Sequence, residues 1–131
     1  VLKDHSIFDP DLMIKTEGVS FDDGRNAAKQ LLNMDKDFDS IFAFTDTLAI
    51  GAMNYLLDEG VKIPKDVSIA SFSGTELAIM VYPQLTSVEQ PMVQMGEAAA
   101  KLVLEKINNK DAQSKTIVMD AKLIYRASTS I

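Results

Sequence analysis

Short apolar segments alternate along this chain with longer segments whose apolar residues recur at helical spacing. The stretch SIFAFTDTLAIGAMNYLLDEG, residues 40–60, contains one segment of each kind. Residues 40–44 are nearly all apolar, as expected for a strand that is covered on both faces. The residues after them share one helical stripe, formed by Ala49, Ala52, Met53, Leu56 and Leu57. Gly60 supplies a C-terminal stop. Strands that alternate with helices predict a parallel sheet with right-handed crossovers.

Further elements follow from the same criteria. They are strands at 12–18 and 67–72, helices at 22–34 and 91–108, a short helix begun by SGTELAIM, and two β-like pieces in the tail, TIVM and KLIYR. Asp22 or Asp23 can cap the first of these helices, and Pro91 suits the first position of the last. The predicted fold class is α/β, with three layers (α/β/α) around a parallel sheet built from segments near 12–18, 40–45 and 67–72.

Short polar residues or glycine stand where the predicted strands end. The three strand ends are Val19–Phe21, Thr45–Asp46 and Ser71–Gly74. Parallel strands end at one edge of the sheet, and open α/β sheets bind ligands in the crevice at that edge. Asp46 fits two roles, as a helix N-cap or first-turn carboxylate that stabilises by about 0.5–2 kcal/mol, or as a ligand-binding group. Thr45 is the better candidate for ligand contact.

Most catalytic chemistries lack their residues in this sequence. SFSGT, residues 71–75, approaches the Gly-x-Ser-x-Gly elbow of hydrolases, but both outer glycines are replaced and the only histidine, His5, lies upstream. Cysteine is absent, and the acidic run DKDFD lacks the Gly and the terminal Glu of a calcium loop. No nucleotide-binding glycine loop follows a strand. The sequence therefore predicts a protein that is not an enzyme and has no metal or cofactor site.

The charge and the termini limit the possible partners. The net charge is −6, whereas a domain that binds DNA by itself relies on a basic patch. We therefore expect no DNA binding by this chain alone. No apolar run reaches the roughly 18 residues of a membrane span, and no signal-peptide pattern is visible. The abrupt start, VLKDHSIFDPDL, is typical of a fragment of a longer protein.

Three segments, in order, carry a family resemblance. They are SIFAFTDTLAIGAMNYLLDEGVKIPKDVSIASFSG, YPQLTSVEQPMVQMGEAAAKLVLEKI and KLIYRAST. Their motifs and joint spacing, over residues 14–130, resemble the effector-binding domain of LacI/GalR-family transcriptional repressors. That family shows a strand ending in Asn-Asp before an Ala-x-Gly-Ala helix, a strand ending in Gly-Phe-Asp, and a Pro-x-Leu-Thr-Thr-Val-x-Gln-Pro crossing. Related periplasmic sugar-binding proteins share the two-lobed fold, but the crossing and the YRAST end look more like the repressors.

The resemblance implies a periplasmic-binding-protein-like (type I) lobe from a two-lobed domain. Residues 1–85 and 113–131 would form the C-terminal lobe, and 86–112 a crossover and a helix of the N-terminal lobe. The DNA-binding helix-turn-helix head would precede Val1. It further implies a cytoplasmic homodimer that binds a sugar-like effector between its lobes and has no membrane partner. The alternative function is a periplasmic sugar-binding protein for transport or chemotaxis. A flavodoxin-like enzyme is a third, which the missing catalytic residues disfavour.

Strand ends and resemblance together select the candidate ligand-binding residues, which are Thr45, Asp46, Ser73, Val19 and Phe21. By position, Thr45 matches the family's polar Asn, Ser73 the Asp of Gly-Phe-Asp, and Val19 a residue that is often aromatic. Ser73 carries no charge and Val19 no ring. We therefore expect a polar, neutral effector, held by hydrogen bonds rather than by an ion pair. Thr45 is expected to face the ligand, Asp46 to cap the helix, and residues 86–89 to lie near Thr45 and Ser73.

Overall fold

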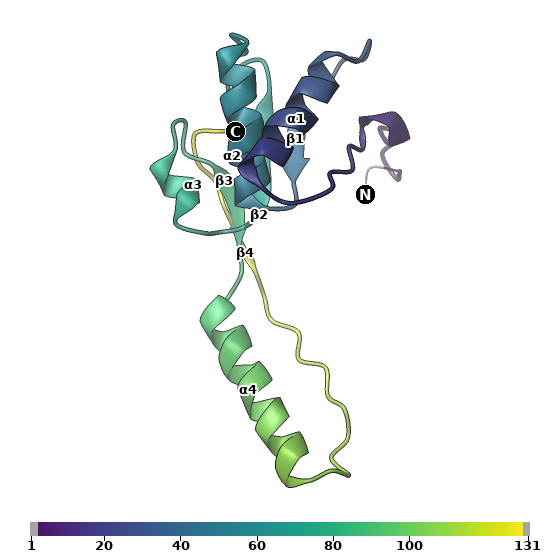
Figure 1. Ribbon diagram of the computed structural model, residues 1–131, viewed down its shortest axis with the longest axis vertical. Helices are drawn as coiled ribbons and strands as arrows, with labels where there is room; N and C mark the ends of the chain where they lie inside the picture. Colours follow the sequence, from purple (N-terminus) through teal and green to yellow (C-terminus); the bar gives the residue numbers. More distant parts are fainter. Residues whose placement is uncertain (1–2, 130–131) are drawn as a thin grey trace.

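The computed structural model describes residues 3–129, which divide into a body and an arm (Figure 1). The arm consists of residues 91–121 and projects from one end of the body. The elements, in chain order, are η1 (Pro10–Leu12), α1 (Phe21–Leu32), β1 (Ser40–Ala43), α2 (Asp46–Asp58), β2 (Ser68–Ser73), α3 (Leu77–Met80), β3 (Thr86–Glu89), α4 (Met92–Asn108) and β4 (Lys122–Ile124). Within this described part, every helix is too short or too polar to cross a membrane.

The body contains one four-stranded sheet with the order β1-β2-β3-β4. The first three strands are parallel, and β4 pairs antiparallel with β3. The predicted α/β fold with its parallel sheet is confirmed. The described residues supply two of the three expected layers, because the side chains of Phe42 and Phe44 are left 66% and 71% exposed. Residues 40–45 are therefore not covered on both sides, as their apolar sequence had suggested, and β1 forms an edge of the sheet.

Residues 12–18 were predicted to be a strand, and this prediction is wrong for the structure. Their burial alternates from residue to residue, as in a strand, with Ile14, Thr16 and Gly18 half-buried. A groove of about 220 Å³ lies between this segment and β1, lined in part by Ile14, Thr16 and Phe42. The segment has no ladder partner, and alternating burial alone does not distinguish such a segment from a paired strand. In the tail, similarly, only the second β-like piece forms a strand, β4.

The core of the body lies between the sheet and its helices. Its buried apolar residues are Ala28, Ala49, Ala52, Met53, Leu56, Val67, Ile69, Ala78 and Leu85. Helix α1 packs on α2 through two glycines. A Cβ atom on Gly24 would lie 2.2 Å from the backbone oxygen of Leu48, and one on Gly51 would lie 2.0 Å from that of Phe21. The two helix backbones are therefore in direct contact.

The start of α1 is capped by Ser20, not by Asp22 or Asp23 as the sequence suggested. The Ser20 hydroxyl accepts a hydrogen bond from the Asp23 N–H (3.1 Å), and the Asp23 carboxylate accepts one from the Ser20 N–H (2.8 Å). This reciprocal pair is a capping box, in which the acidic residue acts three positions after the cap. The end of α2 is as expected, since Gly60 adopts a φ of +82°.

Helix α4 stands clear of the body, and none of its residues is buried (Figure 1). Met92, Met95 and Val103, on or beside its predicted core stripe, are 64%, 43% and 59% exposed. This exposure is what we expect if the helix packs in a lobe outside this chain. The predicted lobe boundary at 86–112 stays a prediction, although residues 86–89 pair within the body's sheet.

The contact between α1 and α2 predicts different effects for two helical glycines. We expect Gly51→Ala to lower the free energy of unfolding by about 1–3 kcal/mol, because the added methyl group meets backbone that cannot move aside easily. Gly96→Ala is the matched control, since its Cβ would meet nothing within 4 Å and alanine favours a helix by up to about 1 kcal/mol. Urea unfolding measures both. Equal effects of the two substitutions would contradict the close packing.

Candidate functional site

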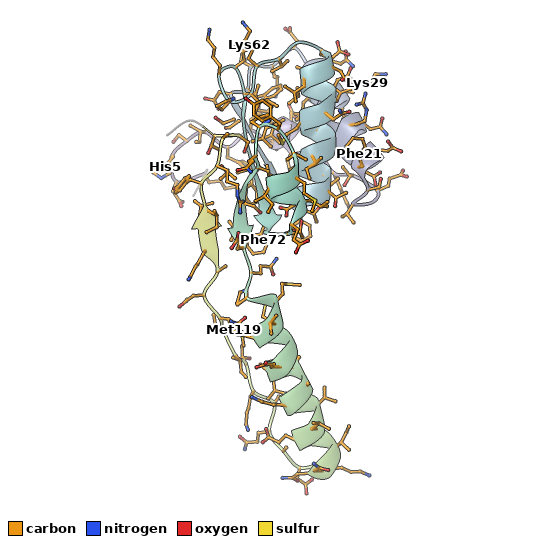
Figure 2. All side chains as sticks on the ribbon, turned by 90° about the vertical axis from the view of Figure 1, so that its left-hand side faces the viewer. His5, Phe21, Lys29, Lys62, Phe72 and Met119 are labelled. Carbon is orange, nitrogen blue, oxygen red and sulfur yellow. The ribbon has the colours of Figure 1, made fainter. Side chains whose placement is uncertain are left out.

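The carboxyl ends of β1, β2 and β3 meet at the end of the body that carries the arm (Figure 1). Phe72 lies at this end and Lys62 at the opposite one (Figure 2). The register of the sheet places Ser71 beside Ser87, and Ser73 beside Glu89. Polar side chains that are distant in the sequence are thereby gathered at one edge.

Asp46, the first residue of α2, is only 1% exposed and accepts four hydrogen bonds. Its Oδ1 accepts from the hydroxyl groups of Ser71 (2.6 Å) and Ser87 (2.8 Å). Its Oδ2 accepts from the N–H (2.6 Å) and the hydroxyl (2.7 Å) of Thr75. A buried carboxylate is tolerated when its oxygens are satisfied in this way. Asp46 therefore joins the start of α2 to the ends of β2 and β3.

These hydrogen bonds also determine the ionisation of Asp46. Burial raises the pKa of this carboxyl, but the hydrogen bonds from Ser71, Thr75 and Ser87 together outweigh burial, and the pKa lies below its ordinary value. The group is thus a carboxylate at neutral pH, and its negative charge also lies at the favourable N-terminal end of a helix.

The roles predicted for Thr45 and Asp46 are partly exchanged. Thr45 is the cap of α2, because its hydroxyl accepts a hydrogen bond from the Leu48 N–H (3.2 Å). Asp46 is therefore not the cap that was expected, but the first-turn carboxylate that the sequence also allowed. Thr45 is half-buried at the edge, and its hydroxyl can still donate to a ligand. The lone pairs of Asp46, in contrast, are occupied by donors of the protein.

The loop after β2 lies tightly against β3. Ser73 is half-buried, and its hydroxyl donates to the carbonyl of Phe72 (2.6 Å). The Gly74 N–H donates to the Ser87 hydroxyl (2.9 Å). The predicted proximity of residues 86–89 to Ser73 thus holds for Ser87 and Glu89.

The remaining predicted residues are less closely connected to this edge. Val19 and Phe21 lie at the start of α1 and are 56% and 39% exposed. The carbonyl of Phe21 faces Gly51 in α2. Thr86 was expected near Thr45, but it is buried against the segment that follows β4. Its hydroxyl forms hydrogen bonds there with Arg126 and Thr129. Odd and even residues of β3 face opposite sides of the sheet, which explains why Ser87 reaches Asp46 and Thr86 does not.

Sequence reasoning missed the partners of Asp46, namely Ser71, Thr75 and Ser87. Ser71 was noted as part of a polar strand end, Thr75 only within the SFSGT motif, and Ser87 as part of the crossing. None of the three was assigned to Asp46. A signal did exist, because the edge is rich in hydroxyl groups. Pairing them with one carboxylate, however, requires the register between β2 and β3.

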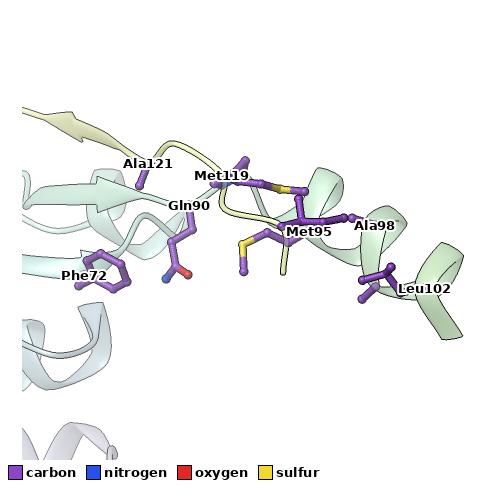
Figure 3. Close-up of a pocket in the computed structure, with 10 residues that line it drawn as sticks. Phe72, Gln90, Met95, Ala98, Leu102, Met119 and Ala121 are labelled. Atoms are coloured by element: carbon purple, nitrogen blue, oxygen red, sulfur yellow. The ribbon is translucent and has the colours of Figure 1, made fainter. Parts of the chain in front are cut away.

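A cavity of about 290 Å³ opens between the body and the arm (Figure 3). Phe72 and Gln90 line it from the end of the sheet, and Met95, Ala98 and Leu102 line it from α4. Its lining contains none of the five predicted site residues, but Phe72 and Gln90 are the chain neighbours of Ser73 and Glu89. The cavity and the polar edge thus lie at the same end of the sheet, the cavity lined mainly by apolar residues and the edge by polar ones.

Residues 3–129 match the family model described as a periplasmic binding protein-like domain. The chain belongs to this family. Catabolite control protein A of Priestia megaterium is 36% identical over 110 residues, which cover 84% of this chain and 33% of that protein. The crystal structure of transcription regulator CcpA of Lactococcus lactis has a TM-score of 0.87 and 29% identity, covering 98% of this chain and 47% of that one.

A LacI family transcriptional regulator from Enterococcus faecium, crystallised with bound ribose, has a TM-score of 0.84 and 27% identity. The match covers 98% of this chain and 48% of that one. The resemblance to LacI-type regulators is confirmed by these relatives. This member of the family spans about a third of the length of the curated relatives it matches.

The lowered pKa of Asp46 predicts an acid-dependent loss of stability. The carboxylate contributes fully above the unfolded-state pKa of about 3.9, and its contribution is lost as the pH falls through the lower folded-state pKa. We expect Asp46→Asn to lower the free energy of unfolding by about 1–3 kcal/mol at pH 7. The difference from wild type should shrink below about pH 4.

Denaturant unfolding between pH 2.5 and pH 7 measures this difference. The matched control is Asp22→Asn, which removes an exposed carboxylate from the first turn of α1. It should change the free energy of unfolding by only a few tenths of a kcal/mol. A difference between wild type and Asp46→Asn that stays constant over this pH range would contradict the role given to the carboxylate.

Proposed function

We propose that this chain is the effector-binding segment of a LacI-type transcriptional repressor, and that its polar edge binds a neutral metabolite such as a sugar. The curated relatives are transcriptional regulators rather than enzymes, and a structural neighbour holds ribose. We further propose that the full-length protein is cytoplasmic and dimeric, and binds DNA through a head outside this chain.

The state of Asp46 is the observation that carries the choice of a neutral ligand. This carboxylate is buried and accepts four hydrogen bonds from the protein, so it offers no charge to a cationic ligand. Thr45 and Ser73 remain as half-buried hydroxyl groups at the same edge. Hydroxyl groups both donate and accept, which suits the hydroxyl groups of a sugar. Val19 and Phe21 could add apolar contact, since both are partly exposed.

Regulation would follow from differential affinity. An effector that contacts this edge and a second lobe binds one arrangement of the lobes better than another, and it shifts their populations accordingly. In a dimer, the orientation of the lobes would set the spacing of the two DNA-binding heads. Residues 86–112, which include the exposed apolar helix α4 of the arm, are the part of this chain that we assign to the second lobe.

The alternative function is a periplasmic sugar-binding protein for transport or chemotaxis. It would use the same edge and the same kind of ligand. The regulators among the relatives favour the repressor. DNA binding by the full-length protein discriminates between the two functions.

Ser73→Leu in the full-length protein is the test of the ligand site. Isothermal titration with ribose and a panel of neutral mono- and disaccharides should find a ligand of the wild-type protein. We expect Ser73→Leu to raise its Kd at least about tenfold, because one hydrogen bond is lost and bulk is added. Ser40→Leu is the control, since Ser40 is exposed at the opposite end of the sheet. Unchanged affinity in folded Ser73→Leu protein would remove this edge from the ligand site.

The net charge of the chain predicts that DNA binding requires a part of the full-length protein outside this chain. This chain, at a net charge of −6, should show no specific binding to duplex DNA at 150 mM salt in a fluorescence-anisotropy titration. The reason is that acidic residues interrupt its densest basic stretches, and phosphate neutralisation supplies most of the affinity for DNA. The full-length protein should bind its operator. Sub-micromolar, sequence-specific binding by this chain alone would overturn the assignment.

A further inference from the structure

The loop of residues 73–75 rests on the last residue of β3. A Cβ atom added to Gly74 would lie 2.4 Å from the Cα of Glu89 and 2.5 Å from its Cγ. Gly74 has a φ of +71°, which glycine adopts without the strain that other residues incur. The loop backbone therefore contacts Glu89 directly, and no side chain fits between them.

Glu89 also stands where the chain leaves the body for the arm. Its Oε1 accepts a hydrogen bond from the Arg126 Nη2 (2.9 Å), and it pairs with Lys122 between β3 and β4. Helix α4 begins shortly after it, at Met92, and the chain returns to the body at Lys122. Both connections between body and arm thus flank Glu89.

Asp46 holds the loop from the other side. Its Oδ2 accepts from the N–H and the hydroxyl of Thr75, and its Oδ1 accepts from the Ser87 hydroxyl. The Ser87 oxygen accepts in turn from the Gly74 N–H (2.9 Å). Three donors of the loop therefore converge on one carboxylate, two directly and one through Ser87. The loop cannot move without breaking or lengthening these bonds.

We propose that Asp46 is a positioning residue that couples the effector-binding edge to the arm, by holding loop 73–75 against Glu89. A displacement of Ser73 by a bound effector would be passed through Gly74 to Glu89 and so to both connections. This inference rests on the proposed function, because Ser73 is the candidate effector contact in the loop. Asp46 itself touches no ligand in this scheme. Coupling of this kind can travel through a chain of packed and hydrogen-bonded residues, which Ser73, Gly74 and Glu89 provide.

Residue-resolved amide hydrogen exchange tests the coupling in the full-length protein, without any ligand. In Asp46→Asn, the amides of Gly74 and Thr75 should exchange at least tenfold faster than in wild type. The amides of Met92 and Met95, which bond to Gln90 and Pro91 at the start of α4, should exchange at least threefold faster. Both factors are taken relative to the amide of Ile69, which is buried and bonded to the Ser128 carbonyl (2.8 Å).

The reference to Ile69 separates positioning from general stability, because global unfolding accelerates all amides together. If all four amides change within twofold of Ile69, Asp46 has only a structural role and the proposal is overturned. If only Gly74 and Thr75 respond, coupling to the arm is overturned. Neither result depends on a sugar, so failure here is distinguishable from failure of the proposed ligand site. Asp22→Asn, at the exposed start of α1, should leave all these ratios unchanged.

Ser87→Ala provides the same test if Asp46→Asn does not fold. This substitution removes the acceptor of the Gly74 N–H and one donor to Asp46, but it leaves Thr75 bound to the carboxylate. Exchange at Gly74 should increase more than exchange at Thr75, and exchange at Met92 should follow Gly74. Unchanged exchange at Gly74 and Met92 in Ser87→Ala, relative to Ile69, would also overturn the proposal.

Discussion

The buried carboxylate of Asp46 is the interaction on which the geometry of the sheet edge depends. Strands β2 and β3 and helix α2 each bring a backbone end to this edge, and ends of elements carry unsatisfied polar groups. One carboxylate with two oxygens can accept from several donors at once, and here it accepts from Ser71, Ser87 and Thr75. Among the described residues, every buried side-chain nitrogen or oxygen has a partner. The polar groups buried beneath this edge are therefore all partnered within the protein.

In this arrangement, two adjacent residues of the same turn have different roles. Thr45 caps α2 and keeps a hydroxyl at the surface of the edge, whereas Asp46 points inward and organises β2 and β3. A charged side chain that satisfies buried donors does not need to meet the ligand. The neutral character that we propose for the effector thus follows from how the charge is used, not from a shortage of acidic residues, of which the chain has 19.

How far the sequence predicted the structure depended on the range of the interactions concerned. Helices α1, α2 and α4, strand β2 and the stop at Gly60 were predicted because periodicity and glycine act within a few residues. The strand at 12–18 was not, because pairing is a property of two segments. The partners of Asp46 were missed for the same reason, because they lie 25–41 residues away and only the register brings them within reach. The caps of α1 and α2 were misplaced for a local reason, since neighbouring Ser, Thr and Asp residues are all good caps. Thr86 was wrongly expected near Thr45, because successive side chains of β3 point to opposite faces of the sheet.

Helix α4 gives the arm the properties of a lever. Its 17 residues, at a rise of about 1.5 Å each, make a rod of about 25 Å. A rotation of about 10° at its base would then displace its tip by about 4 Å, roughly the spacing of two neighbouring strands. A change too small to break a hydrogen bond beside Glu89 would thus become a displacement large enough to reposition whole side chains at the far end. In such a molecule, the stiffness of the short connections, rather than the strength of any single contact, limits how much of a local movement reaches distant parts.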